Sequence, residues 1–403
     1  MAEKAKIPAI RFKGFTDAWE QHELGEIYTE RNERGYDSLQ ILSVSIHHGV
    51  SNKELDSNAL GKEVRRSEDK SLYKHVYFGD LVFNMMRAWQ GAIGVVKFEG
   101  MVSPAYITAI PSAQLFPLFM DYCLRRDRTI IQMNNLSYGV TDFRKRLYWD
   151  SFINILCLIP SSHEQERITA FLTQLDKLIT LQQRKFEKLQ NVKKAMLDKM
   201  FPNNGSNVPE MRFAGFTDAW EQRKLNELGN IVTGSTPSTQ IEGYYSDNGI
   251  PWVTPTDISE NITFSTERKL STAGQKVGRI VPKNTILVTC IASIGKNTML
   301  GTTGSFNQQI NGLIPNEKKN SPYFLFAESA QWSAKMKKSA AAGTMQIVNK
   351  ADFSELTTKV PTLAEQQQIG VFFCNLDNLI SLHQRKLEKL QNIKKACLEK
   401  MFV

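Results

Sequence analysis

Two segments of the chain show a long helical pattern of hydrophobic and polar positions. Residues 163–200 contain neither glycine nor proline, and residues 364–400 contain only Gly370. In both segments apolar side chains recur every three or four positions. This spacing is typical of amphipathic helices. A helix of about 38 residues would be roughly 57 Å long, and so long an apolar stripe needs a partner. We expect the two helices to pack on each other as an antiparallel coiled coil, although each could instead close only its own domain's core.

The sequence before each helix has a mixed pattern, and we call residues 24–159 the first body and residues 225–360 the second body. Short runs rich in β-branched residues, bounded by glycine and asparagine, predict strands at residues 41–45, 81–83, 251–254 and 285–290. Shorter helices are predicted for residues 117–133 and 322–338. The predicted fold class is mixed α/β (α+β): two globular domains separated by two long helices.

The chain is built twice, with a constant offset of 201 residues. Residues 11–21 and 212–222 differ only at Lys13 and Ala214, and we call this segment, RFxGFTDAWEQ, the opening motif. Residues 175–201 and 376–402 match at twenty of 27 positions, whereas the bodies have diverged. Identity confined to the opening motif and the helix indicates one shared scaffold, one common partner and two different targets.

The repeat predicts four segments with an internal pseudo-twofold, circular arrangement. The first domain covers residues 1–160, with its opening motif at 11–21, and the first spacer helix lies within 161–203. The second domain covers residues 204–361, with its opening motif at 212–222, and the second spacer helix lies within 362–403.

Composition adds a weak preference for a polyanionic partner. The formal net charge is +9. The sequence contains no run of about 18 apolar residues of the kind that spans a membrane. The start of the chain lacks the apolar core of a secretory signal. Five scattered cysteines form none of the close pairs that zinc sites or a disulfide framework need. We expect a cytoplasmic, reduced and metal-free protein.

Motifs for catalysis are missing from the sequence. It contains no GxGxxG for a dinucleotide or S-adenosylmethionine, and no Asn-Pro-Pro-Tyr or Asp-Pro-Pro-Tyr of an amino-methyltransferase. Residues 293–297 look superficially like a phosphate loop, but Cys290 replaces its first glycine and Asn297 its Ser or Thr. The pair His47 and His48 has no partner at metal-binding spacing. We therefore predict a subunit that is not an enzyme.

The polar loops of both bodies carry side chains suited to nucleic acid. Arginine can pair with guanine and asparagine or glutamine with adenine through two hydrogen bonds, while lysine and arginine contact phosphates. The candidates in the first body are Asn84, Arg87, Trp89, Gln90, Tyr138, Arg144, Lys145 and Arg146. Those in the second body are Thr236, Thr254, Asp257, Ser293, Lys296, Asn307, Gln308, Gln309, Lys335, Lys337 and Lys338.

The polar side of the long helices repeats the same charged residues. Such a run is usually a solvated face, but solvation does not require the same residues in both copies, whereas a partner that docks twice does. The candidate partner-binding residues are Arg184, Lys185, Lys188, Lys193, Lys194, Arg385, Lys386, Lys389, Lys394 and Lys395.

The duplication, the GFTDAWEQ string and the helix pattern LxxLIxLxQRKxEKLQNxKKAxLxKMF resemble the specificity subunits of type I restriction–modification systems. Residues 234–238, 250–258, 292–296 and 307–309 look like the recurrent target-recognition pattern of that family. The first body departs from it, with residues 79–84 and 103–106 similar to another variant of the family.

This resemblance implies a division of labour. Each body would be a target-recognition domain that reads one half of a split site in double-stranded DNA, with the antiparallel helices as a spacer. Two methyltransferase subunits would dock on the helices for adenine methylation, and motor-nuclease (restriction) subunits would join for cleavage. S-adenosylmethionine, ATP and magnesium would belong to those partners. The N-terminal opening motif would pack near the end of the C-terminal helix.

Two other functions compete with this interpretation. One is a DNA methyltransferase with its own recognition domain, which would bind S-adenosylmethionine by itself. The other is a coiled-coil scaffold that joins two protein partners without reading DNA, whose binding would lack a steep dependence on salt.

Overall fold

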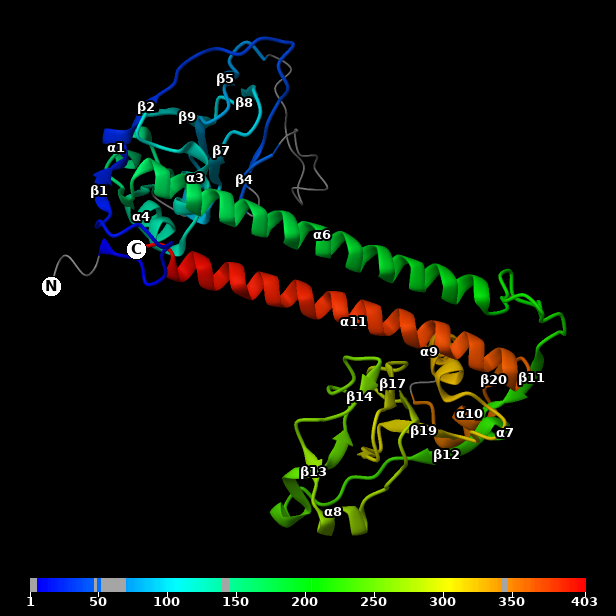
Figure 1. The fold of residues 1–403 in the computed structure, drawn as a ribbon. Coiled ribbons are helices and arrows are strands. Elements are labelled where there is room, and N and C mark those ends of the chain that lie inside the picture. Colours follow the sequence, from blue (N-terminus) through cyan, green and yellow to red (C-terminus); the bar gives the residue numbers. More distant parts are fainter. Residues whose placement is uncertain (1–5, 47–48, 52–69, 140–144, 204, 342–346) are drawn as a thin grey trace. The chain divides into compact units, whose positions relative to one another are not determined.

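The computed structural model describes residues 6–46, 49–51, 70–139, 145–203, 205–341 and 347–403. The chain divides into two compact units, each with its own core (Figure 1). The first unit comprises residues 1–181 and 387–403, and the second comprises residues 182–386. Each unit thus contains one body, one part of each long helix and one opening motif. The four-segment division expected from the sequence stays a prediction.

The first body alternates short strands with short helices before the first long helix. Its elements are β1 (Glu20–Glu23), α1 (Leu24–Ile27), β2 (Tyr28–Glu30), β3 (Val44–Ser45), β4 (Gly49–Val50), β5 (Lys74–Val76), β6 (Leu81–Asn84), the 3-10 helix η2 (Ala88–Gln90), β7 (Ile93–Val95), β8 (Gly100–Val102), β9 (Tyr106–Pro111), α3 (Pro117–Cys123), α4 (Asp127–Leu136), α5 (Trp149–Phe152) and β10 (Leu156–Ile159). A four-stranded antiparallel sheet has the order β2-β9-β6-β7, and two-stranded pairings join β1 to β10, β3 to β4 and β5 to β8.

The second body follows a related plan. Its elements are β11 (Glu221–Lys224), α7 (Leu225–Leu228), β12 (Gly229–Thr233), the 3-10 helix η4 (Glu242–Tyr244), β13 (Tyr245–Val253), β14 (Ile262–Thr263), β15 (Lys269–Leu270), α8 (Thr272–Val277), β16 (Ile286–Thr289), β17 (Asn297–Leu300), β18 (Ser305–Phe306), β19 (Ile310–Pro315), α9 (Pro322–Ala341), α10 (Lys350–Glu355) and β20 (Thr357–Val360). The main sheet has the order β12-β19-β16-β17-β14, and β13 lies between β15 and β18 in a second sheet.

The two bodies share one sheet plan although their sequences differ. The order β2-β9-β6-β7 in the first body corresponds to β12-β19-β16-β17 in the second. The register agrees, since Tyr28 pairs with Pro111 and Gly229 pairs with Pro315. The central strands β6 and β16 are buried apart from the last residue of β6, which explains their continuous apolar sequence. The hairpin turn after β6 is therefore the topological equivalent of the turn after β16.

One predicted helix is wrong in its extent. Residues 117–133 form two helices, α3 and α4, because Arg126 adopts an extended backbone conformation at the start of α4. The break directs Arg126 toward the C-terminus of the chain, where its Nη1 donates a hydrogen bond to the Val403 carbonyl at 2.9 Å. Its guanidinium also lies over the Phe402 ring, 5.0 Å from the centroid. A contact 277 residues away in sequence thus accompanies the helix boundary.

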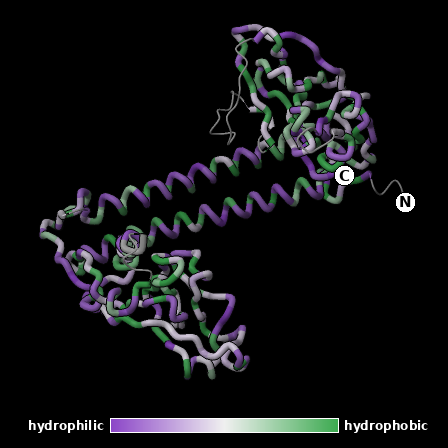
Figure 2. Tube along the Cα trace, turned by 180° about the vertical axis from the view of Figure 1, so that it is seen from behind, coloured by the Kyte–Doolittle hydropathy of each residue, from purple (hydrophilic) through white to green (hydrophobic). Residues whose placement is uncertain are grey.

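Both long helices form, α6 over Ser162–Met200 and α11 over Leu363–Lys400. Within the second unit, His383 Nδ1 contacts Gln182 Oε1 at 2.7 Å and Lys193 Nζ lies 2.7 Å from Asp377 Oδ1. The residue number on α11 falls as that on α6 rises, so these parts run antiparallel. Hydrophobic positions recur at intervals along otherwise hydrophilic helices (Figure 2). The predicted antiparallel pairing is confirmed within this unit.

The opening motif joins the start of one long helix to the end of the other. In the first unit, Arg11 donates two hydrogen bonds of 2.6 Å to the buried Glu164 carboxylate in the first turn of α6. The Ile10 N–H donates to the Lys400 carbonyl at 2.9 Å, and the Trp19 ring meets the Phe402 ring edge-on. Figure 1 shows the C-terminus beside this N-terminal segment. The expected packing of the opening motif near the end of the C-terminal helix is confirmed.

The second unit repeats this arrangement. Arg212 donates two hydrogen bonds of 2.7 Å to the buried Glu365 carboxylate, and the Met211 N–H donates to the Lys199 carbonyl at 2.9 Å. The Trp220 ring meets the Phe201 ring edge-on. Hydrogen bonding to the carboxylate raises the pKa of Arg212, as it does that of Arg11. The opening motif is therefore nearly identical in both copies because it closes the same internal junction twice.

Candidate functional site

Four loops of the second body meet at one end of its sheets, and we call them the second-body loop cluster: residues 233–238, 254–257, 290–296 and 307–309. The Thr236 hydroxyl donates to Gln308 Oε1, and the Asn307 N–H donates to the Val253 carbonyl at 2.9 Å. The Cys290 N–H donates to the Gln309 carbonyl at 2.8 Å. Lys296 Nζ reaches the Pro255 carbonyl at 3.4 Å. The structure thus brings together most of the candidates predicted in this body.

Several of these side chains shape the cluster from within. Asn307 is buried, and its amide exchanges hydrogen bonds with the Gln309 side chain and backbone at 3.0 and 3.1 Å. The Asp257 carboxylate accepts from the Thr254 N–H at 2.8 Å and from its hydroxyl at 2.6 Å, which closes the turn after β13. Asn307 thus supports the turn from within, and its predicted contact with DNA stays a prediction.

The cationic part of the cluster lies on the turn between β16 and β17. Ala292 and Gly295 have φ angles of 63° and 78°, and the Thr289 hydroxyl donates to the Ser293 carbonyl at 2.5 Å. Lys296 is exposed on this turn. A Cβ atom at Gly295 would lie 3.0 Å from Lys337 Cε, so the Lys337 side chain lies against the same turn. Two lysines therefore place positive charge beside the polar loops.

The other two lysines of α9 are not part of this group. Lys335 Nζ donates to the Thr357 carbonyl at 2.8 Å, at the start of β20. Lys338 is exposed, and no contact with the cluster is found for it among the described residues. Both stay predictions as phosphate contacts.

The equivalent hairpin turn in the first body gathers a different set of side chains, which we call the first-body loop cluster: residues 84–90 and 134–148 without 140–144. The Leu147 N–H donates to the Met85 carbonyl at 2.9 Å and joins the two segments. Lys145 Nζ lies 5.3 Å from the centroid of the Trp89 ring, and the exposed Tyr138 ring stacks on that of Tyr148 at 4.9 Å.

Other predicted residues of the first body occupy the same turn. Asn84 Oδ1 accepts a hydrogen bond from the Met86 N–H at 3.0 Å. Arg87 directly precedes the 3-10 helix η2, and Gln90 is its last residue. Arg146 is exposed and bridges to Tyr138 through the backbone. Arg144 lies outside the described residues. The first-body cluster thus presents aromatic and cationic groups, whereas the second presents amides and hydroxyls beside two lysines.

Two residues of the first-body cluster were not predicted. Asn134 Oδ1 accepts from Lys145 Nζ at 2.6 Å and so holds the lysine over Trp89, and Tyr148 supports Tyr138. Asn134 belongs to α4 and sits eleven residues before its partner, so nothing in the local pattern marked it. For Tyr148, the only signal in the sequence was that it lies close to Tyr138 and Arg146 along the chain.

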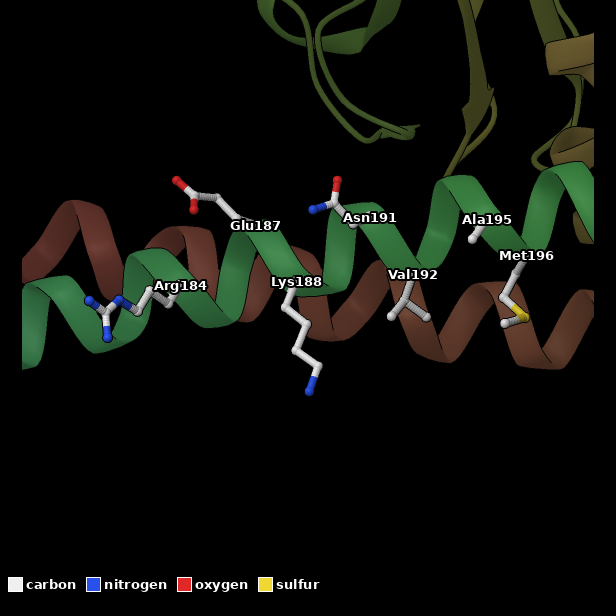
Figure 3. Close-up of a pocket in the computed structure, with 7 residues that line it drawn as sticks. All are labelled: Arg184, Glu187, Lys188, Asn191, Val192, Ala195 and Met196. Carbon is white, nitrogen blue, oxygen red and sulfur yellow. The ribbon is translucent and has the colours of Figure 1, made fainter. Parts of the chain in front are cut away.

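The exposed side of α6 in the second unit carries a shallow groove of about 470 Å³. Its lining residues are Arg184, Glu187, Lys188, Asn191, Val192, Ala195 and Met196. Figure 3 shows Lys188, Val192 and Met196 pointing to one side of the helix and Glu187 and Asn191 to the other. The residues 201 positions later are Arg385, Glu388, Lys389, Asn392, Ile393, Ala396 and Cys397, five of them identical.

Two of the predicted partner-binding lysines have partners inside the chain. Lys193 Nζ lies 2.7 Å from Asp377 Oδ1, and Lys394 Nζ lies 2.6 Å from Asp176 Oδ1. Each carboxylate also accepts a hydrogen bond from a tyrosine hydroxyl: Asp377 from Tyr323 at 2.8 Å, and Asp176 from Tyr122 at 2.9 Å. We call Tyr323–Asp377–Lys193 and Tyr122–Asp176–Lys394 the two triads; each lies within one unit.

The triads correct the argument that repetition of these two lysines requires a docking partner. Burial and the adjacent carboxylate raise the pKa of Tyr122 and of Tyr323, so both phenols remain hydrogen-bond donors at neutral pH. The pairing of α6 with α11 in each unit is sufficient to explain why Lys193 and Lys394 recur. The other eight predicted residues, which are exposed, stay predictions: Arg184, Lys185, Lys188, Lys194, Arg385, Lys386, Lys389 and Lys395.

Two features are absent from the part of the chain that the structure describes. There, no group of three or more histidine, cysteine, aspartate or glutamate side chains could hold a metal ion. No helix within the same residues combines the length and apolarity needed to cross a membrane.

Comparison with known proteins relates the second body and its helix to a defined class of domain. Residues 217–392 match the model of the type I restriction modification DNA specificity domain. The MjaIX type I restriction enzyme specificity subunit of Methanocaldococcus jannaschii is 30% identical over 46% of this chain and 44% of that protein. The HindI specificity subunit of Haemophilus influenzae is 26% identical over 43% of this chain and 39% of that protein. These alignments span less than half the length of either relative.

A solved structure agrees over the whole fold. The S subunit of a type I restriction–modification system from M. genitalium superposes with a TM-score of 0.66, covering 98% of this chain and 99% of that one at 12% identity. The fold and the matched residues define a type I restriction–modification DNA specificity domain. Residues 217–392 match this domain, and the chain as a whole shares the fold of the S subunit.

Proposed function

We propose that this chain selects the DNA sequence on which a type I restriction–modification enzyme acts. Each body reads one half of a bipartite site in double-stranded DNA. The observation that carries the proposal is the shared sheet plan with exchanged loops. The loop clusters around equivalent hairpin turns include Trp89, Lys145 and Tyr138 in one body and Lys296 and Gln308 in the other. One scaffold with two chemically different surfaces suits a site with two unrelated halves.

The proposal also assigns a division of labour among subunits. Two methyltransferase subunits dock on the long helices, and restriction subunits join them for cleavage. Methyl transfer, ATP hydrolysis and DNA cleavage, with S-adenosylmethionine, ATP and magnesium, belong to those partners, and this chain contributes recognition without a catalytic group.

The groove on α6 is the docking surface that we propose for a methyltransferase subunit. Val192, Ala195 and Met196 supply a small apolar floor, and Arg184 and Lys188 supply positive charge beside it. A partner with an apolar anchor and acidic neighbours fits both parts. The repeated residue types around Ala396 would take a second copy of the same partner.

Coexpression with a cognate methyltransferase subunit, followed by sequencing of modified bases, tests the recognition function. We expect a split motif with methylated adenine in both halves. A stable complex of the two proteins that leaves the DNA unmodified would favour the scaffold alternative.

Exchange of the bodies tests the assignment of half-sites. Replacement of residues 24–159 by the first body of another specificity subunit is expected to change one half of the methylated motif and leave the other unchanged. Alteration of both halves would contradict the model of two independent readers.

A further inference from the structure

The turn between β18 and β19 carries three consecutive amide side chains, and only the middle one is exposed to solvent. Asn307 and Gln309 hydrogen-bond to each other, and their backbones are held by Val253 on one side and Cys290 on the other. Gln308, between them, is exposed. The turn is therefore fixed to two neighbouring strands, and its middle side chain points away from the fold.

The position of the Gln308 amide is set by the loop that follows β12. The Thr236 hydroxyl donates to Gln308 Oε1, and the neighbouring Ser235 N–H donates to the Phe306 carbonyl at 2.9 Å. A Cβ atom at Gly234 would lie 2.2 Å from the Asn307 carbonyl oxygen, so only glycine permits this approach of the loop to the turn. The Trp252 indole also donates to the Ser235 carbonyl, at 3.0 Å. The loop that carries Thr236 is thus anchored at several points.

This contact leaves the amide equipped for a second set of hydrogen bonds. One lone pair of Oε1 remains after the bond from Thr236, and among the described residues none accepts a hydrogen bond from Gln308 Nε2. An oxygen acceptor and an adjacent N–H donor match the N6–H donor and N7 acceptor of adenine, a pair that is displayed only in the major groove. Fixing the side chain beforehand lowers the conformational entropy lost on binding.

We propose that Gln308 reads one adenine from the major groove in the half-site of the second body, and that Thr236 is its positioning residue. The proposal rests on the proposed function, since it assumes that this body reads DNA. Lys296 on the neighbouring turn, and Lys337 of α9 beside that turn, would contact the phosphates next to that base.

The test uses the full chain in complex with its methyltransferase subunits and duplexes that carry the methylated motif. For the wild type, we expect one A·T pair in the second half-site at which any other pair lowers affinity about 5- to 150-fold. Replacing its adenine by 7-deazaadenine, which lacks N7, should weaken binding by the wild type. Gln308→Ala should lose both effects at that pair while discrimination at the other pairs is kept.

Two further sets of variants separate positioning from folding. Thr236→Val should lower discrimination at the same pair, and Thr236→Ser, which retains the hydroxyl, should restore it. Gln222→Ala serves as the matched control, because Gln222 is an exposed glutamine on β11, which pairs only with β20. It should leave every position of the motif unchanged.

The outcomes distinguish the two proposals. If the wild-type complex binds all sequences equally, the recognition function itself fails. The assignment of Gln308 to adenine is overturned if the wild type is specific but Gln308→Ala discriminates as before at every base pair. It is also overturned if Gln308→Ala loses discrimination at a G·C pair instead. An equal response of Gln308→Ala and wild type to 7-deazaadenine would also overturn it.

Discussion

At the scale of single residues, the two triads show how similar contacts differ in their energetic weight. The Asp377 side chain is 5% exposed, whereas that of Asp176 is 36% exposed. An exposed ion pair contributes little because water solvates both charges, but a buried carboxylate that loses its cation remains uncompensated. The two lysines repeat in sequence, yet their burial predicts unequal effects on stability.

We therefore expect Lys193→Met to lower the free energy of unfolding of the second unit by about 1–3 kcal/mol. Lys394→Met should lower that of the first unit by less than about 1 kcal/mol, because Asp176 is partly hydrated. Urea denaturation followed by hydrogen exchange of α6 and α11 would measure both. Equal losses in the two variants would contradict the argument from burial.

A second residue-scale feature is a carboxyl group buried in the second body. Glu328 is 2% exposed on α9, and burial raises its pKa to about 8, although the Thr358 hydroxyl donates to it at 2.5 Å and Lys335 and Lys359 lie near. The folded protein thus holds a proton that the unfolded chain releases near the ordinary pKa of 4.5. The free energy of unfolding should fall as pH rises through this window.

Glu328→Gln should remove this pH dependence, because the amide keeps an acceptor for Thr358 and never ionises. We expect the variant to be more stable than the wild type by about 1–3 kcal/mol at pH 8.5, and nearly equal to it at pH 4.5. Thermal unfolding across this pH range would measure the difference. Parallel stability profiles for the two proteins would assign the pH dependence to other groups.

At the scale of elements, the long helices serve two purposes on different faces. One face holds the two helices together through the triads, and another carries the exposed groove. Repetition in the sequence does not separate these purposes, since both demand the same residues twice. The groove places Ala195 on the proposed docking face, and Ala396 is its equivalent 201 positions later.

Ala195→Glu should weaken docking of a methyltransferase subunit roughly 10-fold or more, because it places a charge in the apolar centre of the groove. Glutamate is a good helix former, so α6 should persist. Together with Ala396→Glu it should reduce the number of bound methyltransferase subunits from two to none, as measured by native mass spectrometry.

Gln190→Glu is the control for this pair of variants. It adds the same charge on an exposed position of α6 outside the groove. Equal weakening by Gln190→Glu and Ala195→Glu would indicate a general effect of charge and contradict the proposed docking surface.

At the scale of the whole molecule, the core of each unit is completed by a phenylalanine that follows one of the long helices. Phe402 stacks on Phe119 at 5.3 Å in the first unit, and Phe201 stacks on Phe324 at 5.5 Å in the second. Phe201 and Phe402 follow the last residues of α6 and α11, and both are almost fully buried. The core of the first unit therefore depends on the last residues of the chain.

Phe402→Ala should destabilise the first unit by about 3–5 kcal/mol through the cavity it leaves, and Phe201→Ala should do the same to the second unit. Hydrogen exchange read separately for β6 and β16 would assign each loss to its unit. Loss of protection in the same unit for both variants would contradict the division of the chain into these two cores.

The sequence by itself determined the long helices, the duplication and the resemblance to type I specificity subunits. Local periodicity is enough for a helix of nearly 40 residues, because each hydrogen bond joins residues only four positions apart. Identity at a fixed offset then revealed the opening motif and its partner helix. The same reasoning failed at residues 117–133, where the break at Arg126 accompanies contacts with the last two residues of the chain.

Only the tertiary structure decided which polar residues face inward. Asn307 and Lys193 look like surface residues in sequence, but Asn307 is buried and Lys193 pairs with Asp377 on the other long helix. The constant offset of 201 does not identify equivalent core residues. Phe119 and Phe324 each stack on the phenylalanine that follows a long helix, yet they are 205 positions apart. Side-chain contacts depend on how strands and helices pack, and packing joins residues that no local pattern relates. Gln308 and Thr236, 72 residues apart, became a candidate reader only when the fold placed them in contact.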